Sequence, residues 1–395
     1  MTSLPAPAAR PRDFATYLAS LTATAVGDAV AFVALPFVVL SSGGGQAALG
    51  AVVLSASLPR FLAPLLGTLA DRWPPRAVLG VSALLRAALL ATVALLALRE
   101  SAPLPVLAAF AFLNGLLVTL SFTAGSALTP RLVAPEGLAR ANSLTSAALM
   151  GLPLVGYGLG GLLVKALGSA ETLLVALPLY ALSALAPALL KPLAPGGAQT
   201  GAGFWSQLRG GLSVVRASPP LLVMLLLGFA MNLTLNVVNV LAPLFMQRGA
   251  GGAGGYALFE GLLSGGALLG ALAVGPLARR WSADRLIGLG RGLCALAVLG
   301  LAAPQPAVWF AAAGLLGLSL GLLEVAALTR IQSLAPQVTL GRVMGVFLGL
   351  NALGLSAGAA LGGGHWSGPW LFAALAALLA ALGLLQDAFT RRPAA

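Results

Sequence analysis

Asp28 stands in the middle of an apolar stretch that runs from Phe14 to about Leu40. At about 1.5 Å of rise per residue, Asp28 lies about 21 Å along the helix that this stretch predicts. An ionised carboxylate at that depth in a bilayer is costly, so the residue is a candidate functional group by default. Arg60, in a second apolar stretch, lies at a depth of about 18 Å, which allows the two side chains to meet.

Two interpretations of such a pair are open. Asp28 and Arg60 can form a static salt bridge between helices. They can also form a proton-coupling switch, because separation or displacement by a substrate would leave a desolvated carboxylate that is readily protonated. Arg86, about 15 Å deep in a third stretch, either competes for Asp28 or fixes helix packing. Asp28, Arg60 and Arg86 are therefore the candidates for proton coupling.

A group of asparagines marks a later stretch. Asn232, Asn236 and Asn239 recur at intervals of four and three residues, which places them on one face of a helix. Such a face is costly against lipid, so we expect it to line a cavity or to contact a neighbouring helix. Hydrogen bonding between helices is the alternative role for each asparagine.

Three charged residues lie nearer the ends of their stretches. Arg291 and Glu324 are about 9 Å from the end, where long side chains reach the polar interface cheaply. Glu260 is four residues into its stretch, and we interpret it as mainly interfacial.

Other chemistries lack the residues they need. Cys294 and His365 are the only cysteine and the only histidine, so disulfides, metal sites and imidazole clusters are not expected. There is no phosphate-binding loop of the type Gly-x-x-x-x-Gly-Lys-Ser/Thr, which points to an ion gradient as the energy source. An intramembrane enzyme would need a nucleophile with a base or a metal motif, and neither is evident. We therefore expect no enzyme activity, no cofactor and no metal.

The composition indicates a membrane protein. Apolar residues make up 59% of the chain, charged residues 8%, and the mean hydropathy is +0.98, whereas soluble chains carry roughly 25% charged residues. The run from Leu84 to Leu98 is apolar on all sides, unlike the alternating strands of a membrane barrel. The sequence therefore predicts an all-α integral membrane protein with about twelve transmembrane helices.

The predicted spans fall into two sets. They cover residues 14–40, 47–70, 77–98, 104–127, 142–166, 172–190, 220–246, 256–278, 286–302, 306–328, 342–362 and 369–388. The domains follow as a cytoplasmic tail (1–13), a six-helix bundle (14–190), a cytoplasmic linker (191–219), a second six-helix bundle (220–388) and a cytoplasmic tail (389–395). Within the linker, Phe204, Leu208, Leu212 and Val215 share one helical face, typical of an interfacial helix. Gly210 and Gly211 weaken that prediction, and a disordered linker is the alternative.

Basic residues indicate the orientation. The formal charge is +12, but most of the 22 basic residues lie between apolar stretches, so topology explains them better than nucleic acid does. With the N-terminus inside, sixteen lie on the cytoplasmic side and only Arg99, Lys165 and Arg248 lie outside, while Arg60, Arg86 and Arg291 fall within spans. This bias predicts both termini in the cytoplasm and a location in the plasma (inner) membrane.

An internal repeat predicts how the spans are arranged. Similar heptapeptides begin at Gly67 and Gly275, 208 residues apart, and each closes a span. Pro36 and Pro243, late in the first and seventh spans, are offset by 207. Two pseudo-symmetric halves with the same orientation follow, a plan in which transporters place the substrate near the midplane between the halves.

One loop carries a specific resemblance. It reads Gly67-Thr68-Leu69-Ala70-Asp71-Arg72-Trp73-Pro74-Pro75-Arg76. This run resembles the signature Gly-x-Leu-Ala-Asp-Arg-x-x-x-Arg of the major facilitator superfamily, and the resemblance covers nearly the whole chain. It implies the major facilitator fold and a cytoplasmic gating latch built on Gly67, Asp71, Arg72 and Arg76. It further implies that spans 1, 4, 7 and 10 line the central cavity, which nominates Asp28, Asn114, Asn232, Asn236 and Glu324, with Asn239 on the same face of span 7.

Two weaker motifs narrow the resemblance. The run Gly156-Tyr157-Gly158-Leu159-Gly160-Gly161 is similar to the Gly-Pro-x-x-Gly-Gly element of drug–proton antiporters, although Tyr157 replaces the proline and weakens that assignment. Gly156, Gly160 and Gly161 also form a helix-packing motif, because small residues let helices approach closely. Gly27-Asp28 with Ala34-Leu35-Pro36-Phe37, and Leu84-Leu85-Arg86-Ala87, resemble bacterial drug, macrolide and siderophore exporters of the superfamily.

The function expected is secondary active transport. We predict proton-coupled efflux of small amphipathic or drug-like compounds by alternating access. Uptake or facilitated diffusion of a small solute is the alternative, and a non-transporting membrane scaffold is a remote one. The expected partners are a small-molecule substrate, protons and the lipid bilayer, with no nucleic acid, and the chain is expected to be a monomer.

Overall fold

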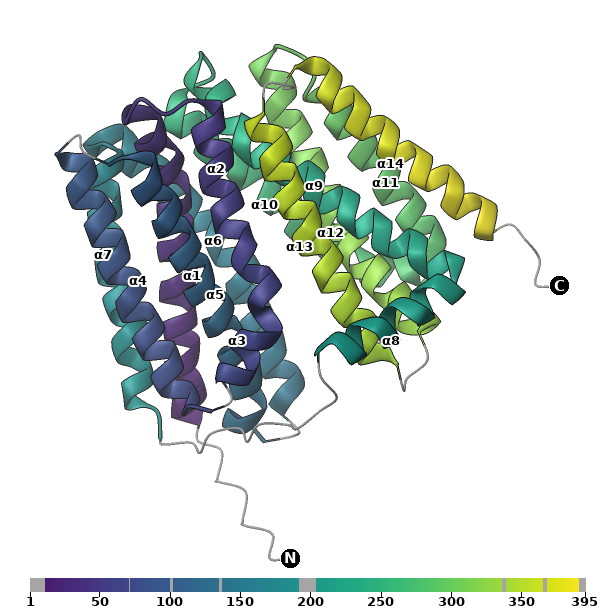
Figure 1. Ribbon diagram of the computed structural model, residues 1–395, viewed down its shortest axis with the longest axis horizontal. Coiled ribbons are helices and arrows are strands. Elements are labelled where there is room, and N and C mark those ends of the chain that lie inside the picture. Colours follow the sequence, from purple (N-terminus) through teal and green to yellow (C-terminus); the bar gives the residue numbers. More distant parts are fainter. Residues whose placement is uncertain are drawn as a thin grey trace, which may run out of the picture.

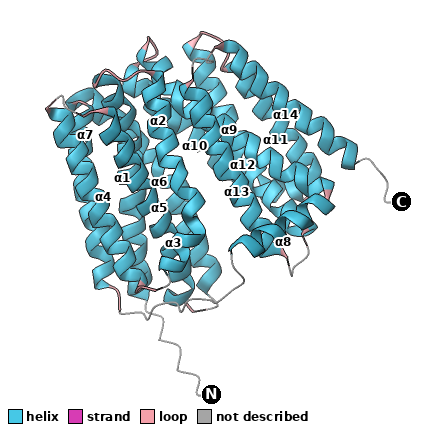
Figure 2. Cartoon of the chain, in the orientation of Figure 1, coloured by secondary structure: helices cyan, strands magenta, loops and turns pink. Residues whose placement is uncertain are grey.

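The computed structural model describes residues 11–70, 72–99, 102–134, 137–191, 204–335, 339–364 and 368–390. These residues form helices and connecting loops only, as predicted (Figure 2). The first half contains α1 (Pro11–Ser41), α2 (Gln46–Ser57), the 3-10 helix η1 (Leu58–Leu62), α3 (Ala63–Ala70), α4 (Pro75–Leu98), α5 (Leu104–Leu132), α6 (Leu138–Leu167), α7 (Ser169–Leu185) and the 3-10 helix η3 (Ala186–Leu189). The second half contains α8 (Phe204–Ala217), α9 (Pro219–Gln247), α10 (Gly252–Ala278), α11 (Ala283–Gly300), α12 (Pro306–Leu334), α13 (Leu340–Gly363) and α14 (Pro369–Thr390).

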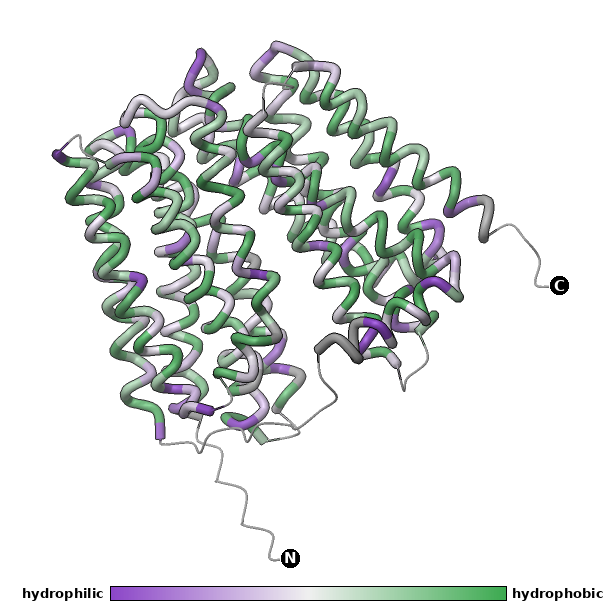
Figure 3. Tube along the Cα trace, in the orientation of Figure 1, coloured by the Kyte–Doolittle hydropathy of each residue, from purple (hydrophilic) through white to green (hydrophobic). Residues whose placement is uncertain are grey.

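Most of these helices are suited to cross a bilayer. Among the described residues, 10 helices are long and apolar enough to do so, and Figure 3 shows apolar residues along their full length. Two of the predicted spans lie outside this group. The span at 47–70 is divided among α2, η1 and α3, and the span at 286–302 corresponds to α11, which carries Asp284, Arg285 and Arg291. Together the helices account for the predicted twelve.

The second span is interrupted for a local reason. Pro59 lies in η1 and Pro64 follows it at the start of α3. Proline has no backbone N–H and crowds the preceding turn, so the chain tightens into a 3-10 turn between α2 and α3. Arg60 lies in that turn, which changes the direction expected for its side chain from a continuous helix.

The predicted repeat is visible in the packing. In the first half α1 packs against α6 and α7, α4 against α5 and α7, and α2 against α5. In the second half α9 packs against α13 and α14, α11 against α12 and α14, and α10 against α12. Each of these five contacts of one half has its counterpart in the other, and Figure 1 shows the two bundles side by side. The two pseudo-symmetric six-helix halves are thereby confirmed.

Contacts between the halves gather at the end of the molecule remote from the N-terminus (Figure 1). There α2 meets α13 and α6 meets α10. Gly50 and Gly363 approach so closely that a Cβ on Gly50 would overlap the other backbone. The Gln46 side-chain amide donates hydrogen bonds of 2.7 Å to the carbonyls of Gly362 and Gly364. The halves are therefore joined at one end.

The helix between the halves is α8. It packs against α13, and Gly210 and Gly211 lie against Arg342 of that helix. A larger residue at Gly211 would collide with the Arg342 backbone, so the two glycines allow the contact. The location of α8 in the membrane interface and the domain boundaries stay predictions.

Candidate functional site

Four polar side chains meet inside the first half. They are Asp28 of α1, Arg86 of α4, Asn114 of α5 and Tyr180 of α7, which we call the α1 carboxylate cluster. The Arg86 guanidinium forms an ion pair with Asp28 Oδ1, and its Nε donates a 2.8 Å hydrogen bond to Asn114 Oδ1. The Tyr180 hydroxyl donates a 2.5 Å hydrogen bond to the same Asp28 oxygen. Four helices are thus joined through one carboxylate and one guanidinium.

The two charges of this cluster differ in burial. The Arg86 side chain is 4% exposed, whereas the Asp28 side chain is 35% exposed. The Arg86 guanidinium also lies 5.1 Å from the centre of the Tyr180 ring, within the range of a cation–π contact. The arginine is therefore enclosed by protein, and the carboxylate is open on one side.

The predicted pairing of Asp28 with Arg60 is wrong. Asp28 pairs with Arg86, and Arg60 is exposed and makes no ion pair with any residue that the structure describes. The reason lies in helix packing. Tyr180 and Arg86 reach Asp28 because α7 packs against both α1 and α4. Arg60 and Asp28 lie at similar depths along their spans, but Arg60 belongs to the 3-10 helix η1 and its side chain does not reach Asp28.

Tyr180 was missed by the sequence reasoning. Its ring is buried with 3% exposure, and a buried tyrosine hydroxyl usually requires a hydrogen-bond partner. A tyrosine within an apolar span was therefore a signal that polar groups lie nearby. Because Tyr180 and Asp28 are 152 residues apart, the sequence gave no indication that Asp28 is the partner of the hydroxyl.

The asparagines of α9 make helix–helix contacts. Asn236 is 4% exposed and donates to Leu355 O at 2.7 Å and to Ser57 Oγ at 3.1 Å. Asn239 donates to Asn236 Oδ1 at 3.0 Å, and Asn232 bonds a carbonyl of its own helix. Asn236 therefore joins α9 to α13 and, through Ser57, to α2 of the other half.

The structure describes only part of the loop motif that runs from Gly67 to Arg76. Gly67 lies on α3 with no neighbour near its Cβ position, and Arg72 is exposed. Arg76 donates a 3.3 Å hydrogen bond to Leu190 O at the end of the first half. Asp71 lies outside the described residues, so the latch stays a prediction.

The glycines of α6 face two different neighbours. Gly156 and Gly160 lie against the backbone of α1, and a Cβ on Gly160 would come within 3.1 Å of Val30. Gly161 lies against Ala257 of α10, in the other half. One helix therefore packs closely both within its half and across to the partner half.

Glu260 is not interfacial, as the sequence suggested, but buried. Because α10 begins at Gly252, earlier than predicted, the residue lies about 12 Å along the helix. It is 3% exposed, and its Oε1 atom has no hydrogen-bond partner. Tyr256 and Tyr157 are its polar neighbours. Glu260 therefore lies in the contact between α10 and α6.

Aromatic rings collect at the same place. Phe32 of α1 lies 5.9 Å from Tyr157 and 6.2 Å from Tyr256, and Phe37 lies 6.1 Å from Tyr256, between ring centres. The Tyr256 ring is fully buried, and its hydroxyl has no well-aligned hydrogen-bond partner although it lies near Glu260. We call Glu260 with these four rings the α10 carboxylate cluster.

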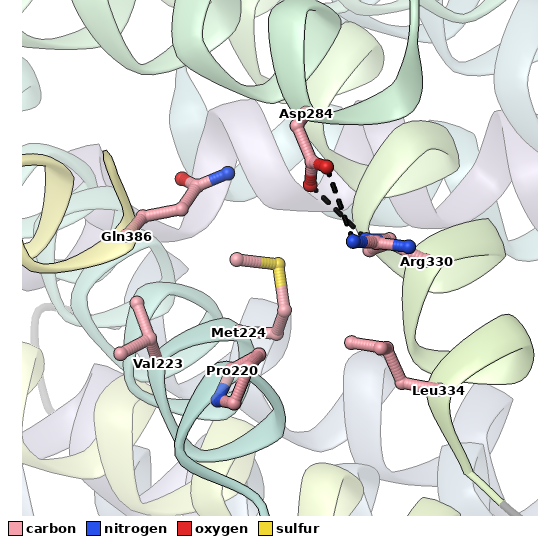
Figure 4. A pocket seen from close by; sticks show the side chains of 7 residues that line it. All are labelled: Pro220, Val223, Met224, Asp284, Arg330, Leu334 and Gln386. Carbon is pink, nitrogen blue, oxygen red and sulfur yellow. Dashed lines mark hydrogen bonds and ion pairs between the residues drawn. The ribbon is translucent and has the colours of Figure 1, made fainter. Parts of the chain in front are cut away.

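The second half also carries charged groups near α11. Arg330 makes a two-pronged contact with Asp284 at 3.0 and 3.1 Å (Figure 4). Arg291 bonds Gln386 at 3.2 Å, so it ties α11 to α14 where we expected only a reach to the interface. Glu324 is exposed on α12.

A cavity of about 10 Å³ beside the Arg330 pair holds about one water molecule, which is too little for a substrate. Its lining consists of Pro220, Val223, Met224, Asp284, Arg330, Leu334 and Gln386.

A larger opening lies between α1 and α7. It has a volume of about 470 Å³ and is lined by apolar residues and Thr22. No charged side chain lines it, so it offers little to orient a polar ligand. Within the described residues, no group of three or more His, Cys, Asp or Glu residues is placed to hold a metal.

Comparison with known proteins places the chain in a family. The sequence pattern described as Major Facilitator Superfamily matches residues 17–359. The multidrug efflux pump Tap of Mycolicibacterium fortuitum is 30% identical over 356 residues, 86% of this chain and 85% of that protein. The enterobactin exporter EntS of Escherichia coli is 29% identical over 262 residues, 64% of this chain and 60% of that one.

Solved structures show the same fold. The nucleoside transporter NupG matches with a TM-score of 0.77 at 12% identity, covering 97% of this chain and all of that one. A bacterial homologue of the iron transporter ferroportin, in an inward-facing state, matches with a TM-score of 0.72 at 17% identity over 96% of this chain and 99% of that one. From the family match and the fold together, the chain belongs to the major facilitator superfamily and is a multi-pass membrane transporter.

Proposed function

We propose that this transporter exports small amphipathic or drug-like compounds from the cytoplasm in exchange for protons. The observation that carries the proposal is the α1 carboxylate cluster, in which a half-exposed Asp28 is held by an enclosed Arg86. An ionisable group within a membrane span is rare unless it serves a substrate or ion pathway. The similarity to proteins named as a drug efflux pump and an enterobactin exporter supports the direction.

We infer that the open side of Asp28 faces the region between the halves. Phe32 lies one helical turn from Asp28 on α1, so both side chains project from one face. Phe32 in turn contacts Tyr256 of the second half. A substrate between the halves would therefore meet Asp28 directly.

Orientation connects this geometry to transport. With the N-terminus in the cytoplasm, as the basic residues predict, the contacts of Gln46 and Gly50 with α13 lie on the outer side. In this conformation the outer side is closed, and Asp28 would be reached from the cytoplasm. In the alternate conformation those contacts separate and the loop of Gly67, Asp71, Arg72 and Arg76 closes the cytoplasmic side. The protein is located in the plasma (inner) membrane, and a single chain is the functional unit.

Protonation of Asp28 would change how the helices are tied together. The charged carboxylate holds Arg86 and Tyr180 and so links α1 to α4 and α7. A proton on Asp28 removes the charge that Arg86 binds, and loss of that proton restores it. Whether Asp28 carries a proton thereby biases which arrangement of the helices is favoured, as in other local electrostatic switches.

Reconstituted vesicles test the proposal. We expect an imposed proton gradient to drive accumulation of a transported compound by the wild-type protein, and Asp28→Asn to abolish this drive while substrate binding stays measurable. Unchanged gradient-driven transport by the variant would refute the role of Asp28.

The direction needs its own measurement. In cells that overproduce the protein, labelled compounds from a panel of drugs are followed with and without an uncoupler. Export predicts that the uncoupler raises cellular accumulation, because the gradient no longer expels the compound. A drop in accumulation would instead establish uptake.

A further inference from the structure

Glu260 is an acidic residue without a cationic partner. It is 3% exposed, and it forms no ion pair with any lysine or arginine in the described part of the chain. One carboxylate oxygen has no hydrogen-bond partner. Burial of an unpaired charge is costly, so a group that supplies positive charge would find a strong counterpart here.

Two tyrosines neighbour this carboxylate. Tyr256 precedes Glu260 by one helical turn and Tyr157 approaches from α6. The rings of both tyrosines contact Phe32 of α1, and Tyr256 also contacts Phe37. Ring faces attract organic cations, and the attraction is larger when the groups are removed from water. The Tyr157 hydroxyl is turned toward Ser264. A carboxylate within a set of rings combines both attractive elements of a cation-binding site.

Phe32 is the exposed edge of the cluster, whereas Glu260 and Tyr256 are buried in this conformation. Phe32 is 38% exposed and borders the Asp28 side of α1. Glu260 and Tyr256 belong to the second half, whereas Phe32 and Tyr157 belong to the first. Movement of α10 away from α6 would therefore uncover Glu260 along the route that a substrate follows.

The two intramembrane carboxylates differ in their need for a cation. Arg86 already neutralises Asp28, whereas Glu260 lacks such a partner. We propose that Glu260, Tyr256, Tyr157 and Phe32 bind the positively charged nitrogen of the substrate, so that the exported compounds include organic cations. This inference rests on the proposed export function and adds a substrate class to it.

Equilibrium binding tests the site without transport. The probe is ethidium, a permanently charged aromatic cation, titrated against the purified full-length protein in detergent by calorimetry. We expect Glu260→Gln to weaken binding about tenfold or more, which corresponds to about 1.4 kcal/mol, because the variant removes the carboxylate charge while the rings stay in place. Glu171→Gln at the outer start of α7 removes an equal charge away from the cluster and is the matched control. Phe32→Leu, at the exposed edge of the cluster, should also weaken binding. It replaces Glu260→Gln as the test variant if Glu260→Gln fails to fold.

Unchanged ethidium affinity in Glu260→Gln, or in Phe32→Leu where the former does not fold, would overturn the proposal. So would an equal loss in Glu171→Gln, because the effect would then not belong to this cluster.

Transport in cells separates this site from a general role in proton coupling. Ethidium export is compared with export of the neutral dye Nile red. Selective loss of ethidium export in Glu260→Gln is expected, whereas equal loss of both dyes with intact ethidium binding would overturn the proposal in favour of proton coupling. If the wild-type protein binds ethidium in a manner that needs Glu260 but exports neither dye, the export function fails and the cation site stands.

Discussion

The α1 and α10 carboxylate clusters place the same chemical group in two different surroundings. Asp28 is held by Arg86 and Tyr180, and all of its partners belong to the first half. Glu260 lies in the contact between the halves and lacks a cation. A charge satisfied within one rigid bundle stabilises that bundle, whereas an unsatisfied charge between bundles is available to a ligand.

The two clusters should therefore differ in how strongly they affect the stability of one half and the contact between the halves. Contacts inside a half persist when the halves move, so while Asp28 is charged its pair with Arg86 should affect stability in every conformation. Contacts between halves form and break during alternating access. Residues such as Glu260, Gly161 and Gln46 should therefore affect transport more than stability.

The largest expected effect follows from removal of one partner of the buried pair. Arg86→Met leaves Asp28 without its cation. Breaking a fully buried pair from one side costs about 3–5 kcal/mol, and the open side of Asp28 places the cost here in the lower part of that range or below it. We expect a marked fall in the thermal unfolding midpoint of the purified protein, followed by fluorescence. Glu260→Gln should change that midpoint little, since no partner is left behind.

A double variant sharpens this prediction. Asp28→Asn combined with Arg86→Met removes both charges, and replacing a buried pair with neutral groups is often tolerated. The double variant should therefore unfold at a higher temperature than Arg86→Met alone. A double variant no more stable than the single one would show that Arg86 acts through packing and not through Asp28.

An intermediate effect is expected from the glycines of α6. Gly156→Val and Gly161→Val introduce the same side chain, but Gly156 packs against α1 within its half and Gly161 packs against α10 across the halves. Inserting extra methyl groups into tight packing costs about 1–3 kcal/mol. Gly156→Val should therefore lower the unfolding temperature, and Gly161→Val should chiefly hinder closure of the halves.

Closure can be measured through cysteines. Cys294 is the only cysteine of the chain and is buried, so a variant without it provides a clean background. A pair of cysteines replacing Gln46 and Gly364 reports contact between α2 and α13 by cross-linking. Gly161→Val should reduce the yield relative to Gly156→Val, and equal yields would contradict the distinction between contacts within and across halves.

Much of the fold followed from the sequence, and part of the site did not. The apolar stretches and the repeat at Gly67 and Gly275 predicted the helices and the two halves because they depend on length and periodicity alone. Depth along the predicted helices nominated Asp28 and Arg86, and the resemblance to the superfamily nominated Asn114. The same depths paired Asp28 with Arg60 because depth along a helix gives only one coordinate, and the rotation of each helix decides which side chains meet.

The two tyrosines show the same limit. Tyr180 and Tyr256 both stand in apolar spans beside a carboxylate. Nothing in their local sequence distinguishes the hydroxyl that donates a 2.5 Å hydrogen bond from the one that lacks a well-aligned partner. Glu260 was assigned to the interface because the start of its helix was placed four residues too late. Only the packing of α6 on α10 shows that it is enclosed.

The smallest expected effect uses these tyrosines as a matched pair. Tyr180→Phe removes a hydroxyl that donates to Asp28. A single intramolecular hydrogen bond contributes about 0.5–1.5 kcal/mol net, and Asp28 keeps Arg86 and its open side in this variant. Tyr256→Phe removes a buried hydroxyl without a well-aligned partner, and loss of an unsatisfied polar group is neutral or stabilising. Thermal unfolding should therefore occur earlier in Tyr180→Phe and unchanged or later in Tyr256→Phe. Equal destabilisation of both would mean that the Tyr256 hydroxyl is engaged after all, and that the α10 cluster is as well satisfied as the α1 cluster.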